Sequence, residues 1–383
     1  MLLLIPGPVM THPTVRQAAN RDVAPWDPAV REEIAHLLQR LRALAGGTEG
    51  EHAAMTLPGS GHFMVEAAIR TFLPAREPGA EAGGILVPAT GQYSERMIRL
   101  AREAGRRVVP LPASLTTPLD PAAVAAALAA DPTITHLGMV YNETSTGIVH
   151  DVEAIGAVVR AAGRRMILDA VSAFGALPVS IAAHPEVDAL LFTANKCLEA
   201  LPGFGIAVCP TERLLAARGQ AGSWTLNLAD VYRNGLENGF GAARFTPPIQ
   251  AMVALHTALD RLEAEGGPPA RLARYRANMN ALIDGVIGLG LEPVLDRRFQ
   301  GPIIMNVRAP AHPDWDLKRF VDVLKSHGVL ISNFRNTEEP SMRIGAIGAI
   351  GPDEIRMAVS AIGRALDELG WSVAPRGGMR IKA

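Results

Sequence analysis

The chain alternates between short apolar runs and longer stretches that have apolar residues at helical spacing. Helical spacing is clear in Pro28–Ala45 and in Phe63–Phe72. Short, mainly apolar runs typical of buried strands occupy Ile85–Val87, Val108–Leu111 and His136–Tyr141. Strands and helices that alternate in this way predict an α/β fold with one large, mostly parallel sheet and helices on both of its faces.

A glycine and proline cluster divides the chain. Gly266-Gly267-Pro268-Pro269 interrupts the pattern, and the following residues have the pattern of a small α/β unit. Its expected elements are Ala270–Gly288, Ile303–Val307, Leu317–Ser326, Val329–Ile331, Met342–Ile344 and Asp353–Leu369. We therefore predict a large domain over residues 26–265 and a small C-terminal domain over residues 266–383, with a loose tail after Trp371. Residues 1–25 are expected to form an irregular arm that packs on the small domain or on a partner subunit.

Composition limits the classes of function. Of the 383 residues, 48% are hydrophobic and 20% are charged, which is typical of a globular protein with a large core. The formal net charge is −1, so neither a nucleic acid nor a membrane surface is indicated as a partner. Cys197 and Cys209 imply no disulfide framework, and the apolar run Leu2–Ile5 is too short for a signal peptide. We expect a cytoplasmic protein that acts on small molecules.

Two of the expected strands run into residues with reactive side chains. Ile167 and Leu168 lead into Asp169, and Ala189–Phe192 leads into Thr193-Ala194-Asn195-Lys196. Continuous apolar runs are typical of parallel strands that are covered on both faces. Because ligands of open α/β sheets bind beyond the carboxyl ends of the strands, Asp169 and Lys196 are expected on the ligand side of one sheet.

This pair suits pyridoxal 5′-phosphate (PLP) as a cofactor. A lysine amine can form a Schiff base with the PLP aldehyde, and a carboxylate can pair with the pyridinium nitrogen and keep the ring protonated. Lys196 and Asp169 are therefore the candidate catalytic residues, with Lys196 as the general base that moves the proton. A buried ion pair, or a lysine at a strand end facing water, would give the same local sequence. No metal site and no nicotinamide dinucleotide site is expected.

A Gly/Ser turn supplies a candidate phosphate site. Thr56-Leu57-Pro58-Gly59-Ser60-Gly61-His62 leads into the helix expected over Phe63–Phe72. Free backbone N–H groups and the helix dipole favour an anion at such a helix start, so Ser60, Gly61 and His62 could hold the cofactor's phosphate. An ordinary glycine turn would have the same sequence.

Several short motifs resemble those of one enzyme family. Asp169-Ala170-Val171-Ser172-Ala173-Phe174-Gly175, Thr193-Ala194-Asn195-Lys196-Cys197 and Pro202-Gly203-Phe204-Gly205 are similar, in order and spacing, to motifs of the class V aminotransferases of PLP fold type I. The resemblance extends from Leu4-Ile5-Pro6-Gly7-Pro8 to Met342-Arg343-Ile344-Gly345 and is nearest to the 2-aminoethylphosphonate–pyruvate transaminases. It implies a seven-stranded type of sheet in the large domain, PLP as the cofactor, and a homodimer with active sites at the interface.

The resemblance also implies roles for single residues of the cofactor site. Tyr93 would stack on the pyridine ring, the Thr144 hydroxyl would reach the ring oxygen, and Val171 and Asn195 would complete the site. Two of these residues have a structural alternative. Tyr93 could instead be a core residue in the first turn of a helix, and Thr144 could instead stabilise a turn.

Residues outside the central motifs are implied in phosphate and substrate binding. Thr246 would reach across the dimer interface to the neighbour's cofactor phosphate; alternatively, it is the N-cap of a helix beginning near Pro247. Arg343 would bind the acid group of the substrate, with Pro8 beside it, because a guanidinium recognises carboxylate or phosphonate through two hydrogen bonds. The alternative is a surface arginine paired with Glu338 or Glu339.

The implied reaction moves the amine of 2-aminoethylphosphonate to pyruvate in a ping-pong sequence, giving phosphonoacetaldehyde and L-alanine. Some positions depart from that subfamily. His62 replaces a small hydroxyl residue and makes the turn similar to that of alanine–glyoxylate and serine–glyoxylate aminotransferases, and Ala243 replaces a tryptophan. Arg335, in Asn333-Phe334-Arg335, is either a second cation for the phosphonate or a solvated arginine. The alternatives are therefore an alanine– or serine–glyoxylate transaminase and, in another class, a PLP lyase or a PLP-binding protein without transaminase turnover.

Overall fold

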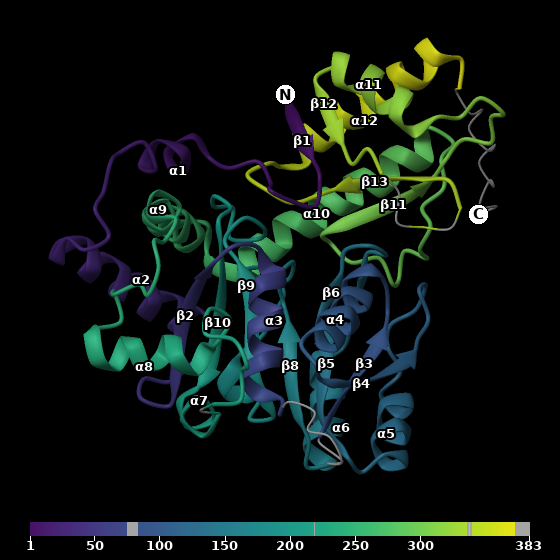
Figure 1. Ribbon diagram of the computed structural model, residues 1–383. Coiled ribbons are helices and arrows are strands. Elements are labelled where there is room, and N and C mark those ends of the chain that lie inside the picture. The colour runs from purple at the N-terminus through teal and green to yellow at the C-terminus, as the bar shows by residue number, and fades with distance from the viewer. Residues whose placement is uncertain (75–82, 218, 335–336, 338, 372–383) are drawn as a thin grey trace.

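The computed structural model describes residues 1–74, 83–217, 219–334, 337 and 339–371 (Figure 1). Two predictions from the sequence lie outside these residues, namely the role of Arg335 and the loose tail after Trp371.

A seven-stranded sheet forms the centre of the larger part of the molecule (Figure 1). Its strands follow the spatial order β2-β10-β9-β8-β5-β3-β4. Strand β10 is antiparallel to both of its neighbours, and the other neighbouring pairs are parallel. The strands are β2 (His52–Pro58), β3 (Gly84–Ala89), β4 (Arg107–Pro112), β5 (Ile134–Val140), β8 (Arg165–Asp169), β9 (Val187–Thr193) and β10 (Phe204–Pro210). The mostly parallel α/β sheet predicted from the sequence is confirmed.

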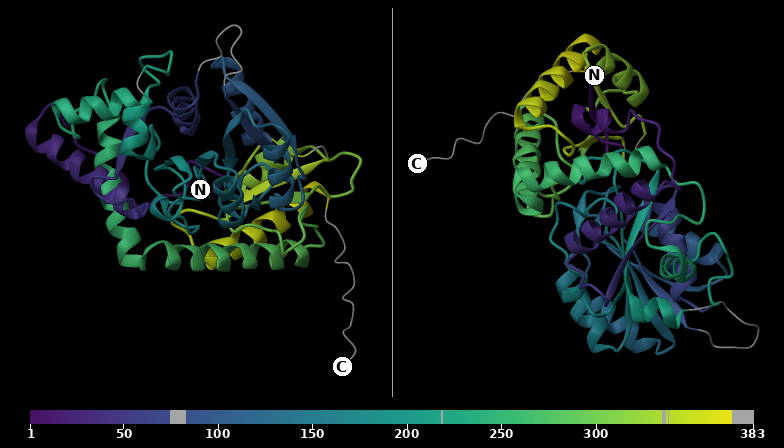
Figure 2. Two further views of the ribbon diagram at one scale, coloured as in Figure 1. Left: turned by 90° about the horizontal axis from the view of Figure 1, so that it is seen from below. Right: turned by 90° about the vertical axis from the view of Figure 1, so that its left-hand side faces the viewer.

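Helices cover both faces of this sheet (Figures 1 and 2). Neighbouring residues of a strand point to opposite faces of the sheet. Ile167 therefore packs with a first group of helices on one face, and Leu168 packs with a second group on the other face. This arrangement explains why the strands are continuous apolar runs. The first group contains α3 (Gly61–Phe72), α4 (Gln92–Glu103), α7 (Thr211–Ala216) and α8 (Leu228–Asn238). The second contains α2 (Pro28–Leu44), α5 (Pro121–Ala130), α6 (Val152–Ala161) and α9 (Ile249–Glu265).

Local sequence sets several helix ends. The carboxylates of Asp27, Asp120 and Asp151 each accept a hydrogen bond from a backbone N–H group in the first turn of α2, α5 and α6, respectively. At the end of α9, Gly266 adopts a left-handed conformation with φ of 107°, which glycine tolerates well, and the next helix begins at once.

A second apolar core lies in the C-terminal part of the chain. Leu282, Phe320, Ile344 and Ile362 belong to it, and each is fully buried. The elements around this core are α10 (Gly267–Gly288), β11 (Ile304–Arg308), α11 (Leu317–Ser326), β12 (Val329–Ile331), β13 (Ser341–Gly345) and α12 (Pro352–Leu369). We propose that residues 26–265 form the large domain and that residues 266–383 form the small domain. Helix α10 runs from one to the other (Figure 2).

The N-terminal segment is more ordered than expected. Residues of β1 (Leu2–Leu4) pair in parallel with β12, and Leu4 lies in the core of the small domain. Helix α1 (Pro13–Ala18) then contacts α9. The expectation of an irregular arm is therefore wrong for these residues, because apolar residues before Pro6 extend a sheet of the same chain. The sequence interpretation also missed β2, β10, α7, α8 and the short hairpin of β6 (Asn142–Glu143) and β7 (Ile148–Val149).

Candidate active site

The carboxyl ends of the parallel strands meet at one edge of the large sheet, beside the small domain (Figure 1). A cavity of about 350 Å³ lies at this edge. Asp169 is the last residue of β8, and Lys196 follows the last residue of β9 by three positions. Eight of the twelve predicted site residues line the cavity: Ser60, Gly61, His62, Tyr93, Asp169, Val171, Asn195 and Lys196. The other four, Pro8, Thr144, Thr246 and Arg343, are not among the residues that line it.

Lys196 lies in a tight, mostly apolar environment. Its Nζ donates a hydrogen bond to the Pro6 carbonyl at 2.7 Å, so the N-terminal segment of the same chain closes one side of the site. Burial, with a smaller contribution from the charge of Arg343, lowers the pKa of Lys196 to about 8, and Cys197 and Asp169 partly oppose this shift. Roughly a tenth of the amine is therefore neutral at pH 7 and about half near pH 8. Only a neutral amine can act as a base or a nucleophile.

Asp169 lines the cavity and is only 8% exposed. One carboxylate oxygen accepts a hydrogen bond from the Val171 backbone N–H at 2.9 Å, which fixes the side chain against the turn after β8. Burial raises the pKa of Asp169 to about 7, and the Val171 N–H and the Lys196 charge only partly oppose this shift. A cation placed against this carboxylate would stabilise its charged form.

The start of helix α3 forms another wall of the cavity. The N-cap residue Ser60 makes no side-chain hydrogen bond to the first turn, so the N–H groups at this helix start have no side-chain cap. Gly61 is buried against Val171, and an added Cβ would lie 2.7 Å from a Val171 methyl carbon. The hydroxyl of Thr193, which also lines the cavity, is buried without a hydrogen-bond partner among the described residues.

Two rings from different helices lie side by side in the cavity wall. The rings of His62 and Tyr93 are stacked, with centroids 6.0 Å apart and an interplanar angle of 28°. The guanidinium of Arg96 lies 4.9 Å from the centre of the Tyr93 ring, and its Nη1 is 3.0 Å from His62 Nε2. Burial lowers the pKa of His62, and the charges of Arg96 and Lys196 add to this effect, so the imidazole is neutral at neutral pH.

Glu143 fixes the start of α4 and was not predicted as a site residue. Its carboxylate is fully buried and accepts hydrogen bonds from the backbone N–H groups of Tyr93 and Ser94 at 3.3 and 3.2 Å. Burial raises the pKa of Glu143, and the hydrogen bonds from Ser145, Ser94 and Tyr93 oppose this shift. A carboxylate at a helix N-terminus is also stabilised by the helix dipole, so Glu143 holds Tyr93 in place.

Arg343 is a buried residue of β13. It is only 1% exposed, which makes the alternative of a surface arginine wrong; Glu339 pairs with Arg308 instead. The Arg343 guanidinium donates to Ser332 Oγ and to the Thr144 carbonyl, both at 3.4 Å. Burial lowers the pKa of Arg343, while a hydrogen bond with the Tyr93 side chain and the charge of Glu143 raise it. Through Tyr93 and Thr144, Arg343 is joined to the cavity wall.

Pro8 and Thr144 are not among the residues that line the cavity. Thr144 is buried in the loop between β6 and β7, and its carbonyl, rather than its hydroxyl, makes the contact with Arg343. Pro8 is exposed and follows Gly7, whose backbone packs against the Lys196 side chain.

Thr246 is exposed and is not among the residues that line the cavity of its own chain. The alternative that it caps the following helix is wrong, because α9 begins at Ile249 and its N-cap is Pro248. The segment is held in place by Arg244, which pairs with Asp230 at 2.7 Å and donates to the carbonyl of Trp224.

Some cavity residues were not predicted, although a local sequence signal marks a few of them. Thr193 ends the strand before Lys196, and Pro202 and Gly203 belong to a motif already noted. Nothing local marks Met97 and Leu100, because they are ordinary apolar positions in the second and third turns of α4.

The family model for class V aminotransferases (Aminotransferase class-V) matches residues 57–350 of this chain. The chain belongs to the class V aminotransferase family. The family predicted from the motifs around Asp169 and Lys196 is thereby confirmed.

Relatives and solved structures support the same assignment over almost the whole chain. A 2-aminoethylphosphonate–pyruvate transaminase of Burkholderia ambifaria is 40% identical over 369 residues, covering 96% of each chain. One of Burkholderia pseudomallei is also 40% identical, covering 96% of this chain and 97% of the relative. Pyridoxamine–pyruvate aminotransferase from Mesorhizobium loti has a similar structure, with a TM-score of 0.87, 26% identity, and coverage of 98% of this chain and 94% of the other. Alanine–glyoxylate aminotransferase from Nostoc sp. has the same fold, with a TM-score of 0.83, 24% identity and 95% coverage of both chains.

No helix in the described part of this class V aminotransferase combines the length and the apolar character needed to cross a bilayer.

Proposed function

We propose that this class V aminotransferase uses PLP to move the amino group of 2-aminoethylphosphonate to pyruvate, giving phosphonoacetaldehyde and L-alanine. The observation that carries the proposal is the buried Arg343, which is joined through Tyr93 to the cavity that Lys196 and Asp169 line. A buried guanidinium beside a reactive amine suits a substrate with an acid group at one end and an amine at the other. The 40% identity to relatives that carry this name supports the choice of substrates.

The residues of the cavity fit PLP. The uncapped start of α3 at Ser60, Gly61 and His62 offers N–H groups to a phosphate. The buried Asp169, which also lines the cavity, can pair with a protonated ring nitrogen. Its elevated pKa reflects the cost of keeping a negative charge there without a partner. The unsatisfied hydroxyl of Thr193 is a further polar group of the cavity that a ligand could engage.

Lys196 would attach the cofactor through Nζ, and Tyr93 would lie against its ring, with Val171 and Asn195 completing the site. Bound PLP supplies an aldehyde that takes up amines and a protonated ring that acts as an electron sink. Lys196 then serves as a general base at Nζ, which its lowered pKa allows near neutral pH. Asp169 keeps the ring nitrogen protonated, and the neutral His62 packs beside Tyr93 without adding charge.

Arg343 would bind the acid group of each substrate in turn, the phosphonate of the donor first and the carboxylate of pyruvate second. Both groups present two oxygens that match the planar guanidinium fork. Its present hydrogen bonds to Ser332 and Thr144 are long, so exchange for a stronger charge-assisted bond is favourable. Use of one arginine for both acids is compatible with ping-pong kinetics, because the two substrates never occupy the site together.

We further propose that the enzyme is a cytoplasmic homodimer in which Thr246 of one subunit reaches the cofactor phosphate of the other. The surroundings of Thr246 support this role. Trp224, which is 68% exposed, packs edge-on against Phe245 with ring centroids 5.1 Å apart, and Phe240 lines the same groove as Phe245. Exposed aromatic residues grouped in this way are typical of protein interfaces.

The proposal is tested by a screen of donors and acceptors. The purified protein, loaded with PLP, is mixed with 2-aminoethylphosphonate, L-serine or L-alanine, each with pyruvate or glyoxylate, and the product amino acids are quantified. We expect the highest kcat/KM for 2-aminoethylphosphonate with pyruvate and parallel lines in double-reciprocal plots.

The same screen separates the alternatives. Transfer from L-serine or L-alanine to glyoxylate, without use of 2-aminoethylphosphonate, would support the alternative of an alanine– or serine–glyoxylate transaminase, to which the turn at His62 is similar. Loss of the donor amine without formation of an amino acid would point to a lyase instead.

A further inference from the structure

The turn that follows Lys196 has an unusual backbone conformation. Glu199 has φ of 55° and is the only residue other than glycine, among those the structure describes, with a positive φ. Its N–H closes the turn with a hydrogen bond to the Lys196 carbonyl at 2.9 Å. A left-handed conformation costs free energy for a residue with a side chain and persists only where surrounding contacts hold it. The contacts of Glu199 are therefore expected to matter for the placement of Lys196.

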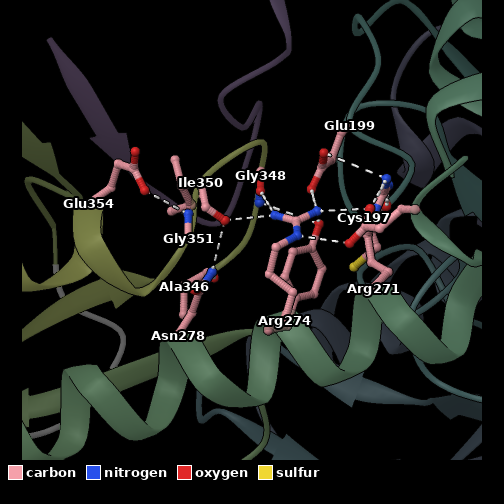
Figure 3. A network of polar contacts seen from close by, with 12 residues as sticks. Cys197, Glu199, Arg271, Arg274, Asn278, Ala346, Gly348, Ile350, Gly351 and Glu354 are labelled. Carbon is pink, nitrogen blue, oxygen red and sulfur yellow. Dashed lines mark hydrogen bonds and ion pairs between the residues drawn. The ribbon is translucent and has the colours of Figure 1, made fainter.

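Side chains of α10 hold this turn (Figure 3). The carboxylate of Glu199 accepts hydrogen bonds from the Tyr275 hydroxyl at 2.6 Å and from Arg274 at 2.8 Å. Arg271 donates to the carbonyl of Cys197, the residue next to Lys196, at 2.7 Å. Glu199, Arg271 and Tyr275 are all buried, so water does not compete for these hydrogen bonds.

The same helix also holds the segment that follows Arg343 (Figure 3). Arg274 donates to the carbonyls of Gly348 and Ile350 at 2.6 and 2.7 Å, and Asn278 donates to that of Ala346 at 2.9 Å. Ala346 comes three residues after Arg343, directly beyond the end of β13. The helix α10 thus fixes the turn after Lys196 and the loop after Arg343 with the same cluster of side chains.

We propose that Glu199, with Arg274 and Tyr275, is a positioning residue that fixes the separation between the Lys196 amine and Arg343, and thereby selects the length of the amine donor. A donor must place its amine at the cofactor held by Lys196 while its acid group lies on Arg343. A fixed separation favours one chain length and disfavours a donor with one more methylene group. This inference rests on the proposed function, because it takes an aminoalkylphosphonate as the donor.

The test compares 2-aminoethylphosphonate with 3-aminopropylphosphonate, which is one methylene longer, in the PLP-loaded enzyme with pyruvate as acceptor. The main variant is Glu199→Gln, which keeps the shape of the side chain and removes its charge. Tyr275→Phe removes one hydroxyl that donates to Glu199 and is the milder second variant, in case Glu199→Gln folds poorly. Glu186→Gln is the matched control, because Glu186 is also a buried glutamate in an ion pair, with Arg160, but lies before β9 at the opposite end of that strand.

We expect Glu199→Gln to lower kcat/KM for the shorter donor by about tenfold to a hundredfold, the usual effect of a misplaced reacting group. The kcat/KM for the longer donor should fall much less, so the ratio of kcat/KM for the shorter donor to that for the longer donor becomes smaller. Tyr275→Phe should change the ratio in the same direction by a smaller factor. Glu186→Gln should leave the ratio as in the wild type. All three variants should still bind PLP, as fluorescence on titration of the cofactor-free protein would show, since every side chain that lines the cavity is kept.

Equal losses for both donors in Glu199→Gln and Tyr275→Phe would overturn the inference, because a purely structural role predicts no change in the ratio. A narrowed ratio in Glu186→Gln would also overturn it. If the wild-type enzyme used neither phosphonate, the proposed function would fail and this inference would fail with it, an outcome distinct from equal losses.

Discussion

At the scale of single residues, the site combines two groups whose ordinary charge states are both disfavoured by burial. Burial raises the pKa of Asp169 to about 7 and lowers that of Lys196 to about 8. Asp169 is therefore close to half-titrated at neutral pH, and Lys196 reaches that point about one pH unit higher, in the range expected of groups that exchange protons with a ligand. A cofactor with a cationic ring nitrogen and a reactive aldehyde would satisfy both of them.

Asp169 gives a prediction on stability for the cofactor-free protein. Its pKa rises from an ordinary value of 3.8 to about 7 in the folded state, so the folded state holds the proton more tightly than the unfolded state. The carboxyl group therefore stabilises the fold fully below its unfolded pKa, and that contribution is lost as the pH rises through about 7. The free energy of unfolding of the wild type, compared with that of Asp169→Asn, should fall between about pH 4 and pH 7, by up to roughly 1.4 kcal/mol per pH unit.

Urea unfolding of both cofactor-free proteins at several pH values measures this difference. A difference that stays constant or grows with rising pH would mean that Asp169 is not a buried group with a raised pKa.

Arg343→Lys tests the substrate site. Lysine offers a point charge in place of a planar fork, so KM should rise for 2-aminoethylphosphonate and for pyruvate by comparable factors. Each factor should correspond to a loss of about 1–3 kcal/mol of binding free energy. Arg308→Lys is the control, since Arg308 is a partly exposed arginine of the neighbouring strand β11 that pairs with Glu339. A rise for pyruvate alone would exclude binding of the phosphonate by Arg343, and no rise for either substrate would place the acid group elsewhere.

At the scale of elements, the site depends on how the starts of helices meet the ends of strands. The first turn of α3 packs so closely on the turn after β8 that Gly61 has no room for a side chain. Gly61→Ala should push α3 away from Val171, cost about 1–3 kcal/mol of unfolding free energy as an overpacked contact, and weaken PLP binding. Gly288→Ala is the control, because nothing lies within 4 Å of a Cβ there.

Thermal unfolding and PLP titration of the two variants decide the matter. A Gly61→Ala protein with wild-type stability and PLP affinity would show that this contact does not position the phosphate site.

The elements also show how far the sequence could be interpreted. The run Ala189–Phe192 was predicted because continuous apolar residues are distinctive, and the observed strand β9 contains it and is buried along its whole length. Strand β2 was missed because Thr56–His62 was interpreted as a Gly/Ser turn before a helix. Strand β10, which is antiparallel to both of its neighbours, was missed because Pro202–Gly205 was considered only as a family motif. The side-chain network of α10 was not predicted either. Arg271, Arg274 and Tyr275 look like ordinary polar positions of a helix until the turn after Lys196 is placed against them.

At the scale of the whole molecule, the small domain supplies Arg343 and the large domain supplies Lys196 and Asp169, so the substrate would bind between the two. The family motifs at both ends of the chain predict this arrangement, and the place of Arg343 in the site stays a prediction. It did not predict that β1 joins the sheet of the small domain, because three apolar residues before Pro6 give no sign of which strand they pair with.

The dimer is tested by mixing variants. Thr246→Val would weaken the proposed phosphate contact, and Lys196→Ala would remove the proposed catalytic amine. If Thr246 serves the neighbouring site, a heterodimer of the two variants has one intact site and one site with both lesions, so activity should be regained on mixing. If mixing regains no activity while heterodimers form, Thr246 does not serve the neighbour's site.

The central claim is that an amine moves from 2-aminoethylphosphonate to pyruvate in the cavity around Lys196. The most direct measurement follows ¹⁵N-labelled 2-aminoethylphosphonate with unlabelled pyruvate in the PLP-loaded enzyme, with Lys196→Ala as the control. We predict that ¹⁵N-labelled L-alanine and phosphonoacetaldehyde form in equal amounts, and that the Lys196→Ala protein forms neither. Labelled ammonia without labelled alanine, or no consumption of the phosphonate by an enzyme that transfers the amine of L-serine, would contradict the account.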